Sequence, residues 1–305
     1  MKLLLLMAFL ACGSVANAQL PNEKFGKPSS MEWEYNGWGE AINADAIILC
    51  KKMKVTYQIS DQVANFNKNS SEISSDNISD FGKNQIDDGN ILVKYEFRLR
   101  TKILKQEGAR HADIDIIYFY SDNSKIFDEL TDLKVRVFSK NEKGKVETRK
   151  VNTASFIKER LDDNYMVVHV VVPDVQAGSI IEYQYNIISP RAAFLYDWVF
   201  QECIPTVRSK CDIEIPAFLQ FNMNVPINKL IKSGVEVGQL AYDTNRPDFK
   251  KGKTCPTNHY KIVGDYILPQ EQAPEIIAPF TSQINMPGVT IPAKIPEGNT
   301  HLRVK

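Results

Sequence analysis

Apolar and polar side chains alternate along much of this sequence, and the pattern is clearest between Pro173 and Pro216. A period of two is typical of a β-strand with one buried face, because successive side chains of a strand point to opposite sides. One predicted buried face consists of Ile181, Tyr183, Tyr185 and Ile187. A second consists of Phe194, Tyr196, Trp198 and Phe200. The segment contains no recognisable catalytic set, so the pattern predicts structure rather than an activity.

Further runs with strand character lie between turn signals such as Asn141-Glu142-Lys143-Gly144. Tyr165 to Val172 is almost continuously apolar, which is typical of a strand that is covered on both faces. Many short strands separated by turns predict an all-β protein, and we expect a large antiparallel β-sandwich. The other predicted strands are Ala46 to Cys50, Met53 to Ile59, Ile91 to Leu104, Asp113 to Tyr120, Leu133 to Phe138, Lys145 to Val151, Phe218 to Val225 and His259 to Leu268.

Helix signals are few. Ser29 and Glu32 predict a capping box before a short first helix, and Ser155 to Leu161 is expected to form one or two turns. The segment from Asp61 to Asn90 is rich in Asn, Ser and Asp, which is typical of a long surface loop. We therefore expect one or two short helices beside the strands.

The N-terminus has the layout of a secretory signal peptide. Lys2 precedes an apolar run from Leu3 to Ala11, and Ala16-Asn17-Ala18 fits a cleavage site. We therefore expect an exported protein that resides in the periplasm, at the cell surface or outside the cell. An alternative is a lipoprotein anchored through Cys12, although Phe9 fits that processing signal poorly.

Three regions follow from these features: a signal peptide over residues 1–18, a β-sandwich domain over residues 19–275, and an extended proline-rich tail or linker over residues 276–305. No stretch reaches the roughly 18 apolar residues of a membrane span, so no integral membrane segment is expected. The sequence has 37 basic and 37 acidic residues, a balance that argues against nucleic acid or an anionic membrane as a partner.

Four cysteines follow the predicted signal peptide: Cys50, Cys203, Cys211 and Cys255. Cys50 ends an apolar run and is expected to be a buried small hydrophobe. The pairing of the other three stays open, and one alternative is a bridge between Cys203 and Cys211 across a turn.

Catalytic patterns are weak. Cys255 and His259 form the one close pair of a thiol and an imidazole, but no helix signal follows the cysteine to lower its pKa. The structural interpretation, a loop that leads into a strand, is the simpler one. The sequence also lacks HExxH, GxSxG, P-loop, CxxC and complete EF-hand patterns, so we expect no enzyme, no cofactor and no metal.

Two further histidine patterns have simple structural explanations. His111, Asp113 and Asp115 would share one face of a strand and could ligate a metal, but a solvated polar face explains the same alternation. His169 lies in the most apolar predicted strand and is expected to be a core histidine.

The aromatic cluster of Trp33, Tyr35 and Trp38 provides the candidate ligand contacts of this chain. Exposed aromatic side chains can stack on sugar rings or anchor a partner protein. The alternative is that these rings pack the N-terminal segment onto the sandwich.

Four sequence blocks carry a family resemblance: FGKPS at Phe25 to Ser29, RTKILKQEG at Arg100 to Gly108, PDVQAGSIIEYQYNIISP at Pro173 to Pro190, and DWVFQECIPTVRS at Asp197 to Ser209. In these blocks the chain resembles a bacterial domain of unknown function that precedes transglutaminase-like domains in exported proteins of Bacteroidetes. The resemblance runs from about Lys24 to about Glu275. It implies a large N-terminal β-sandwich followed by a papain-like domain with catalytic Cys, His and Asp. Lys305 lies about where that second domain would begin, so no catalytic residue is carried over.

These observations favour an exported, non-catalytic module that binds or positions a peptide, a glycan or a partner protein in the cell envelope. A transglutaminase-like protein or domain is one such partner. One alternative is the N-terminal accessory portion of a transglutaminase-like cysteine peptidase or acyltransferase. Another is a carbohydrate-binding module that uses Trp33, Tyr35 and Trp38.

Overall fold

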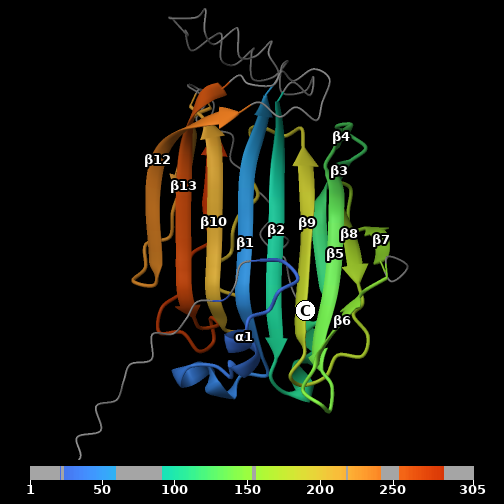
Figure 1. Ribbon diagram of the computed structural model, residues 1–305. Helices are drawn as coiled ribbons and strands as arrows, with labels where there is room; N and C mark the ends of the chain where they lie inside the picture. Colours follow the sequence, from blue (N-terminus) through green and yellow to red (C-terminus); the bar gives the residue numbers. More distant parts are fainter. Residues whose placement is uncertain are drawn as a thin grey trace, which may run out of the picture.

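The computed structural model describes residues 21, 24–59, 91–152, 156–217, 219–241 and 254–284. The predicted signal peptide, Cys12, the predicted loop over residues 61–90 and most of the predicted tail lie outside these residues. Within them, a large sheet and a small sheet form two layers (Figure 1). The prediction of an all-β protein with few helices is confirmed.

The large sheet has eight strands in the order β12-β13-β10-β1-β2-β9-β5-β6. Among the described strands, every neighbouring pair is antiparallel except β1 and β10, which run parallel. The bounds are β12 (Ile231–Ala241), β13 (Thr254–Ile267), β10 (Thr206–Pro216), β1 (Ala46–Ile59), β2 (Ile91–Ile103), β9 (Ile180–Ser189), β5 (Glu129–Lys140) and β6 (Val146–Lys150).

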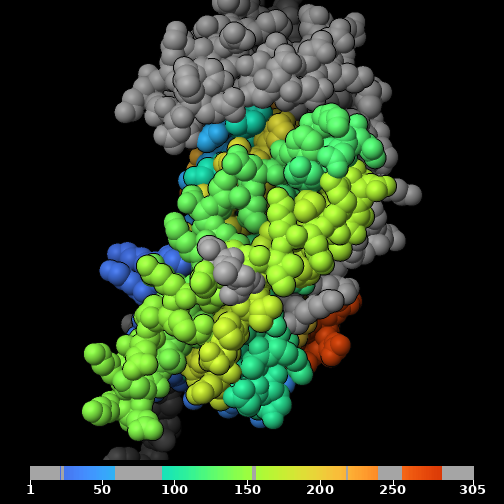
Figure 2. Space-filling model, turned by 90° about the vertical axis from the view of Figure 1, so that its right-hand side faces the viewer, coloured from blue at the N-terminus to red at the C-terminus, as the bar shows by residue number. Residues whose placement is uncertain are grey.

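The smaller elements complete the fold. The small sheet has the order β4-β3-β8-β7, and β11 pairs with β14. Figure 2 shows the side of the molecule where β3 to β8, coloured green to yellow-green, form much of the surface. The bounds are β3 (Ile114–Ser121), β4 (Ile126–Phe127), β7 (Phe156–Arg160), β8 (Tyr165–Val170), β11 (Phe221–Asn224), β14 (Thr281–Ile284), α1 (Ser30–Glu34) and the 3-10 helices η1 (Gly39–Asn43) and η2 (Gln106–His111).

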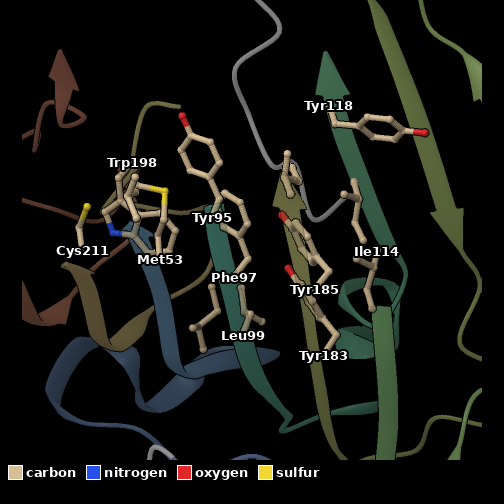
Figure 3. Close-up of a cluster of buried hydrophobic side chains, with 14 of the residues drawn as sticks. Met53, Tyr95, Phe97, Leu99, Ile114, Tyr118, Tyr183, Tyr185, Trp198 and Cys211 are labelled. Atoms are coloured by element: carbon tan, nitrogen blue, oxygen red, sulfur yellow. The ribbon is translucent and has the colours of Figure 1, made fainter. Parts of the chain in front are cut away.

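The main core lies between the two sheets. β9 confirms the predicted alternation, because Tyr183 and Tyr185 are buried on its inner face. Phe97 of β2 stacks on Tyr185 with ring centroids 4.8 Å apart, and Ile114 of β3 packs in the same cluster (Figure 3). β1 joins two predicted runs into one strand, with a register shift between Ile48 and Cys50 that marks a β-bulge.

The predicted strand over Phe194 to Phe200 is wrong. This segment makes one isolated bridge, between Trp198 and Phe280, and otherwise crosses the inner face of the large sheet without regular pairing. Buried side chains take the place of a neighbouring strand. Tyr95 Oη donates to the carbonyl of Phe194 at 2.9 Å, and Lys51 Nζ donates to the carbonyl of Val199 at 2.7 Å. Because these carbonyls have partners, the segment can be buried without forming a sheet.

The predicted helical turns over Ser155 to Leu161 are also wrong, because Phe156–Arg160 forms β7 at the edge of the small sheet. Phe156 lies opposite Val170 of β8 and packs against the core. Burial of Phe156 beside a neighbouring strand outweighs a weak local preference for helix.

The first helix is confirmed. Ser29 Oγ accepts from the Glu32 amide, and Glu32 Oε2 accepts from the Ser29 amide, which completes the predicted capping box. The predicted boundaries at residues 18 and 275 stay predictions. Beyond residue 275, Ile277 and Phe280 are buried against the domain.

Candidate functional site

The N-terminal segment with Trp33, Tyr35 and Trp38 lies across the outer face of the large sheet, the face opposite the main core (Figure 1). Trp38 meets Tyr266 of β13 edge to face, with ring centroids 5.4 Å apart. All three aromatic side chains are half-buried. They pack against a second apolar cluster formed by Ile47, Leu49, Phe138, Ile180 and Val207.

Lys102 of β2 holds the backbone of this segment against the large sheet. Its Nζ donates to the carbonyls of Trp33 and Tyr35 at 2.6 and 2.7 Å. Burial lowers the pKa of Lys102 to about 8, and burial raises the pKa of Tyr35 to about 12. The contacts favour a packing role for the cluster, because a platform for sugar rings needs open aromatic faces.

A buried ion cluster holds the same segment. Arg100 is fully buried between Glu32 and Glu182, with Nη1 to Oε1 of Glu32 at 2.5 Å and Nη2 to Oε1 of Glu182 at 2.8 Å. Glu182 also accepts from Arg98 and from the amide of Gly26. Gly26, Arg100 and Glu182 belong to three of the four resemblance blocks, so these blocks meet in the buried ion cluster. Their shared role in this cluster is a structural reason for the resemblance.

Basic side chains also line a shallow depression beside this cluster, with Cys50 among the lining residues. Acidic neighbours accompany these cations. Lys52 and Lys210 lie 3.5 and 3.3 Å from Asp212, and Arg208 lies 3.7 Å from Asp265. These contacts place carboxylates beside three of the basic side chains, so part of the positive charge of the depression is compensated.

No activated thiol is found among the described side chains. Burial raises the pKa of Cys50 to about 12, and burial raises the pKa of Cys211 well above its ordinary value. Desolvation also raises the pKa of Cys203, and no disulfide joins Cys203 to Cys211. A nucleophilic cysteine needs the opposite shift, toward the thiolate.

Cys255 and His259 both lie within β13. Four residues along a strand span about 13 Å, so the two residues cannot form a hydrogen-bonded catalytic pair. His259 lies opposite Glu214 of β10 and Glu236 of β12. A structural role is therefore favoured over a catalytic pair, although Cys255 lies within the strand and not, as predicted from the sequence, in a loop before it.

The structure does not bring His111, Asp113 and Asp115, the residues of the possible metal site, together. His111 lies in η2, and Asp113 accepts from the Val172 amide at 2.9 Å. Asp115 instead contacts His169, with Oδ1 2.6 Å from Nδ1. Over the described residues, no group of His, Cys, Asp and Glu side chains could hold a metal ion.

The prediction of a core histidine at 169 is wrong. Its side chain is 34% exposed on the outer face of the small sheet, and Nε2 lies 2.9 Å from Oε1 of Glu159. The hydrogen bond with Asp115 is the main cause that raises the pKa of His169. The residues around His169 are mostly valines, so the sequence has no alternation of polar and apolar residues from which the exposed face of β8 could be predicted.

The edge strand β12 is the feature that sequence reasoning missed. Its one sheet neighbour among the described strands is β13, so its other edge is open (Figure 1). Val235 is 61% exposed and Val237 is 83% exposed. Both valines lie on the core side of the sheet, because Val235 is opposite Tyr260, which packs against the core. The core-facing side of the large sheet therefore continues onto β12, where its apolar side chains Val235 and Val237 are exposed.

None of the helices in the described part of the chain is long and apolar enough to cross a membrane. A comparison with curated proteins finds none that matches. A similar solved structure is a crystal structure named a "putative protease" from Parabacteroides distasonis ATCC 8503, with 10% sequence identity and a TM-score of 0.49. The similarity covers 79% of this chain and 40% of that one, so this chain spans less than half of that protein's length.

A protein-family model matches residues 90–243, about half of the chain. The match begins beside the first residue of β2 and ends just after β12, so it includes strands of both sheets. The model is described as "Domain of Unknown Function with solved-structure structure (DUF3857)". The chain therefore belongs to the DUF3857 family.

Proposed function

We propose that this protein is an exported, non-catalytic β-sandwich module that binds a partner protein by strand addition along β12. The observation that carries the proposal is the open edge of this 11-residue strand, with Val235 and Val237 exposed beside it. An unpaired strand edge offers a row of backbone donors and acceptors, and neighbouring side chains then select the incoming strand.

The opposite edge of the large sheet supports this choice. β6 is only 5 residues long and carries Glu147, Arg149 and Lys150. Short length and charge are ordinary ways to keep a strand edge from pairing. β12 is more than twice as long and contains no proline, so the same sheet protects one edge and leaves the other accessible.

A non-catalytic role is supported by the raised pKa values of the three described thiols and by the separation of Cys255 from His259 along β13. Export is supported by the apolar run between Lys2 and the Ala16-Asn17-Ala18 site. We place the protein in the periplasm, at the cell surface or outside the cell on this sequence evidence.

Photo-crosslinking tests the proposed function. A photoreactive amino acid in place of Val237 is expected to give discrete crosslinked products in cells that produce the full chain. The control position is Ile227, which is fully exposed but lies in the segment before β12. Products of equal yield at both positions, or none at Val237, would contradict strand addition.

A second candidate is the N-terminal accessory portion of a transglutaminase-like cysteine peptidase or acyltransferase. The four sequence blocks favour it, and they also support an origin in Bacteroidetes. The intact mass of the protein isolated from its own cells separates the candidates. A mass that corresponds to residues 19–305 supports the stand-alone module, whereas a much larger mass supports a catalytic domain on the same chain.

The carbohydrate-binding alternative has weaker support, because the contacts of Trp33, Tyr35 and Trp38 are internal. Trp38→Ala separates the two roles. Loss of glycan binding with the fold retained would favour a sugar site, whereas a lower melting temperature alone would favour packing.

A further inference from the structure

We propose that the partner strand is β12 of a second copy of this chain, paired antiparallel in a register centred on Gly234. This rests on the proposed function, because it uses the same open edge. The two large sheets would then form one continuous sheet across a twofold axis that passes between the two Gly234 residues. The occupant is identified by the side chains of β12 itself.

The geometry of a strand restricts the possible registers. Backbone N–H and C=O groups of alternate residues point to opposite edges, so only every second residue of β12 can bond to an incoming strand. In a twofold antiparallel pair, residues that point outward must lie opposite each other. The axis must therefore pass through a residue of β12 rather than between two residues, and the outer faces of both copies then lie on the same side.

The register centred on Gly234 places side chains of opposite charge across from each other. Lys232 of each copy lies opposite Glu236 of the second copy, so the register contains two cross-strand pairs of opposite charge. Both residues belong to the outer face, where Glu236 already contacts Lys261 of β13 at 2.5 Å. The side chains of Glu236 and Lys261 are 64% and 41% exposed, so Glu236 can accept from a second lysine.

The same register matches the apolar face. Ile231 of each copy lies opposite Val237 of the second copy, and Val235 lies opposite Ser233. Val237, the more exposed of the two valines of β12, is thereby covered by an apolar neighbour. At the axis, Gly234 meets itself, and a Cβ at this position would meet nothing within 4 Å in the single chain.

Neighbouring registers are less favourable. A pair centred on Glu236 places the two Glu236 carboxylates directly opposite each other, which is destabilising. A pair centred on Val235 places Glu236 opposite Gly234 and Lys232 opposite Gly238, so both charge pairs are lost. Charge complementarity therefore selects the register centred on Gly234.

Sedimentation of the purified full chain over a range of concentrations tests the inference. The wild-type protein is expected to show a reversible equilibrium between monomer and dimer. Glu236→Lys places two pairs of lysines opposite each other, and we expect it to weaken dimerisation at least about tenfold. The double variant Lys232→Glu with Glu236→Lys restores opposite charges and is expected to restore dimerisation.

Glu96→Lys is the matched control. It reverses the same charge on the same outer face, but it lies on β2 in the interior of the sheet. We expect the control to dimerise as the wild-type chain does. Melting temperatures of all four proteins show whether each variant retains the fold.

A wild-type chain that stays monomeric at every concentration would overturn the second-copy inference, as would equal dimerisation of Glu236→Lys and Glu96→Lys. The two proposals fail separately. A monomeric chain whose Val237 position still crosslinks to another protein refutes the second copy and supports strand addition. A crosslinked product of twice the chain mass at Val237 supports both.

Discussion

Replacing Arg100 by methionine is expected to lower the free energy of unfolding by about 3–5 kcal/mol. Arg100 is the buried cation that lies between Glu32 and Glu182, and all three side chains are fully buried. Methionine fills much of the arginine volume but carries no charge. The variant therefore keeps two carboxylates inside the protein with one cation fewer to stabilise them.

The magnitude follows from this burial. Glu182 keeps its contact with Arg98, and Glu32 keeps the amide of Ser29. Neither contact replaces the lost guanidinium, so the cost lies in the range for breaking one side of a buried ion pair. A surface pair gives the comparison: Lys94 and Glu96 on β2 are 30% and 43% exposed, so Lys94→Met is expected to cost less than about 1 kcal/mol.

Urea denaturation followed by tryptophan fluorescence measures both variants. The pH dependence then identifies the cause. A buried carboxylate without its cation can take up a proton, so the deficit of Arg100→Met is expected to shrink as the pH falls from about 7 to about 5. Adding Glu32→Gln and Glu182→Gln to the variant is expected to recover most of the loss.

A deficit no larger than that of Lys94→Met would refute the assignment of Arg100 as an essential buried cation. A large deficit that does not change with pH would mean that lost packing, rather than unpaired charge, is the cause.

Three further predictions test other parts of the fold. Phe280 is fully buried and its backbone bridges to Trp198, so Phe280→Ala is expected to cost about 3–5 kcal/mol in urea denaturation, against less than about 1 kcal/mol for the 41% exposed Phe194→Ala. The raised pKa of His169 contributes stability below pH 6.5 that is lost as the pH rises through the folded-state value. The melting temperature of the wild-type chain relative to His169→Gln should therefore fall as the pH rises above 6.5, and a constant difference would contradict this. Iodoacetamide at neutral pH is expected to leave Cys50 and Cys211 unmodified until urea unfolds the chain, as peptide mass mapping can show, because burial raises both thiol pKa values.

The alternation of β9 and the capping box at Ser29 were predictable from sequence because both depend on neighbouring residues. In β9 each second residue faces the core, and in the capping box two side chains bond to amides three residues away. Local patterns of this kind do not depend on distant partners.

β7 and β12 were not predictable in the same way. Phe156–Arg160 becomes a strand because β8 lies beside it, and this neighbour is not visible in the local pattern. β12 contains Gly234 and Gly238 and only one well-spaced pair of valines, so its strand signal is weak. An edge strand has a neighbouring strand on one side only, and much of its surface is exposed. It therefore needs few buried apolar residues, and the alternation that predicts a strand from sequence is weak.

The aromatic cluster shows a different limit. The sequence correctly places Trp33, Tyr35 and Trp38 close together, but a sugar platform and a packing cluster require the same residues. Lys102 makes the difference, because it holds the backbone of this segment from a strand that follows it by almost 70 residues. Long-range contacts of that kind decide between the two roles.

The parallel pairing of β1 with β10 also limits how this protein can fold. Ile48 and Thr206, which lie opposite each other in these two strands, are 158 residues apart in the sequence. The centre of the large sheet therefore closes a long loop, and such non-local topologies fold slowly. Until residue 216 has left the ribosome, one edge of β1 has no partner, and β13 and β12 have no sheet to join. During synthesis, β1 must therefore avoid incorrect strand pairing until most of the chain has been made.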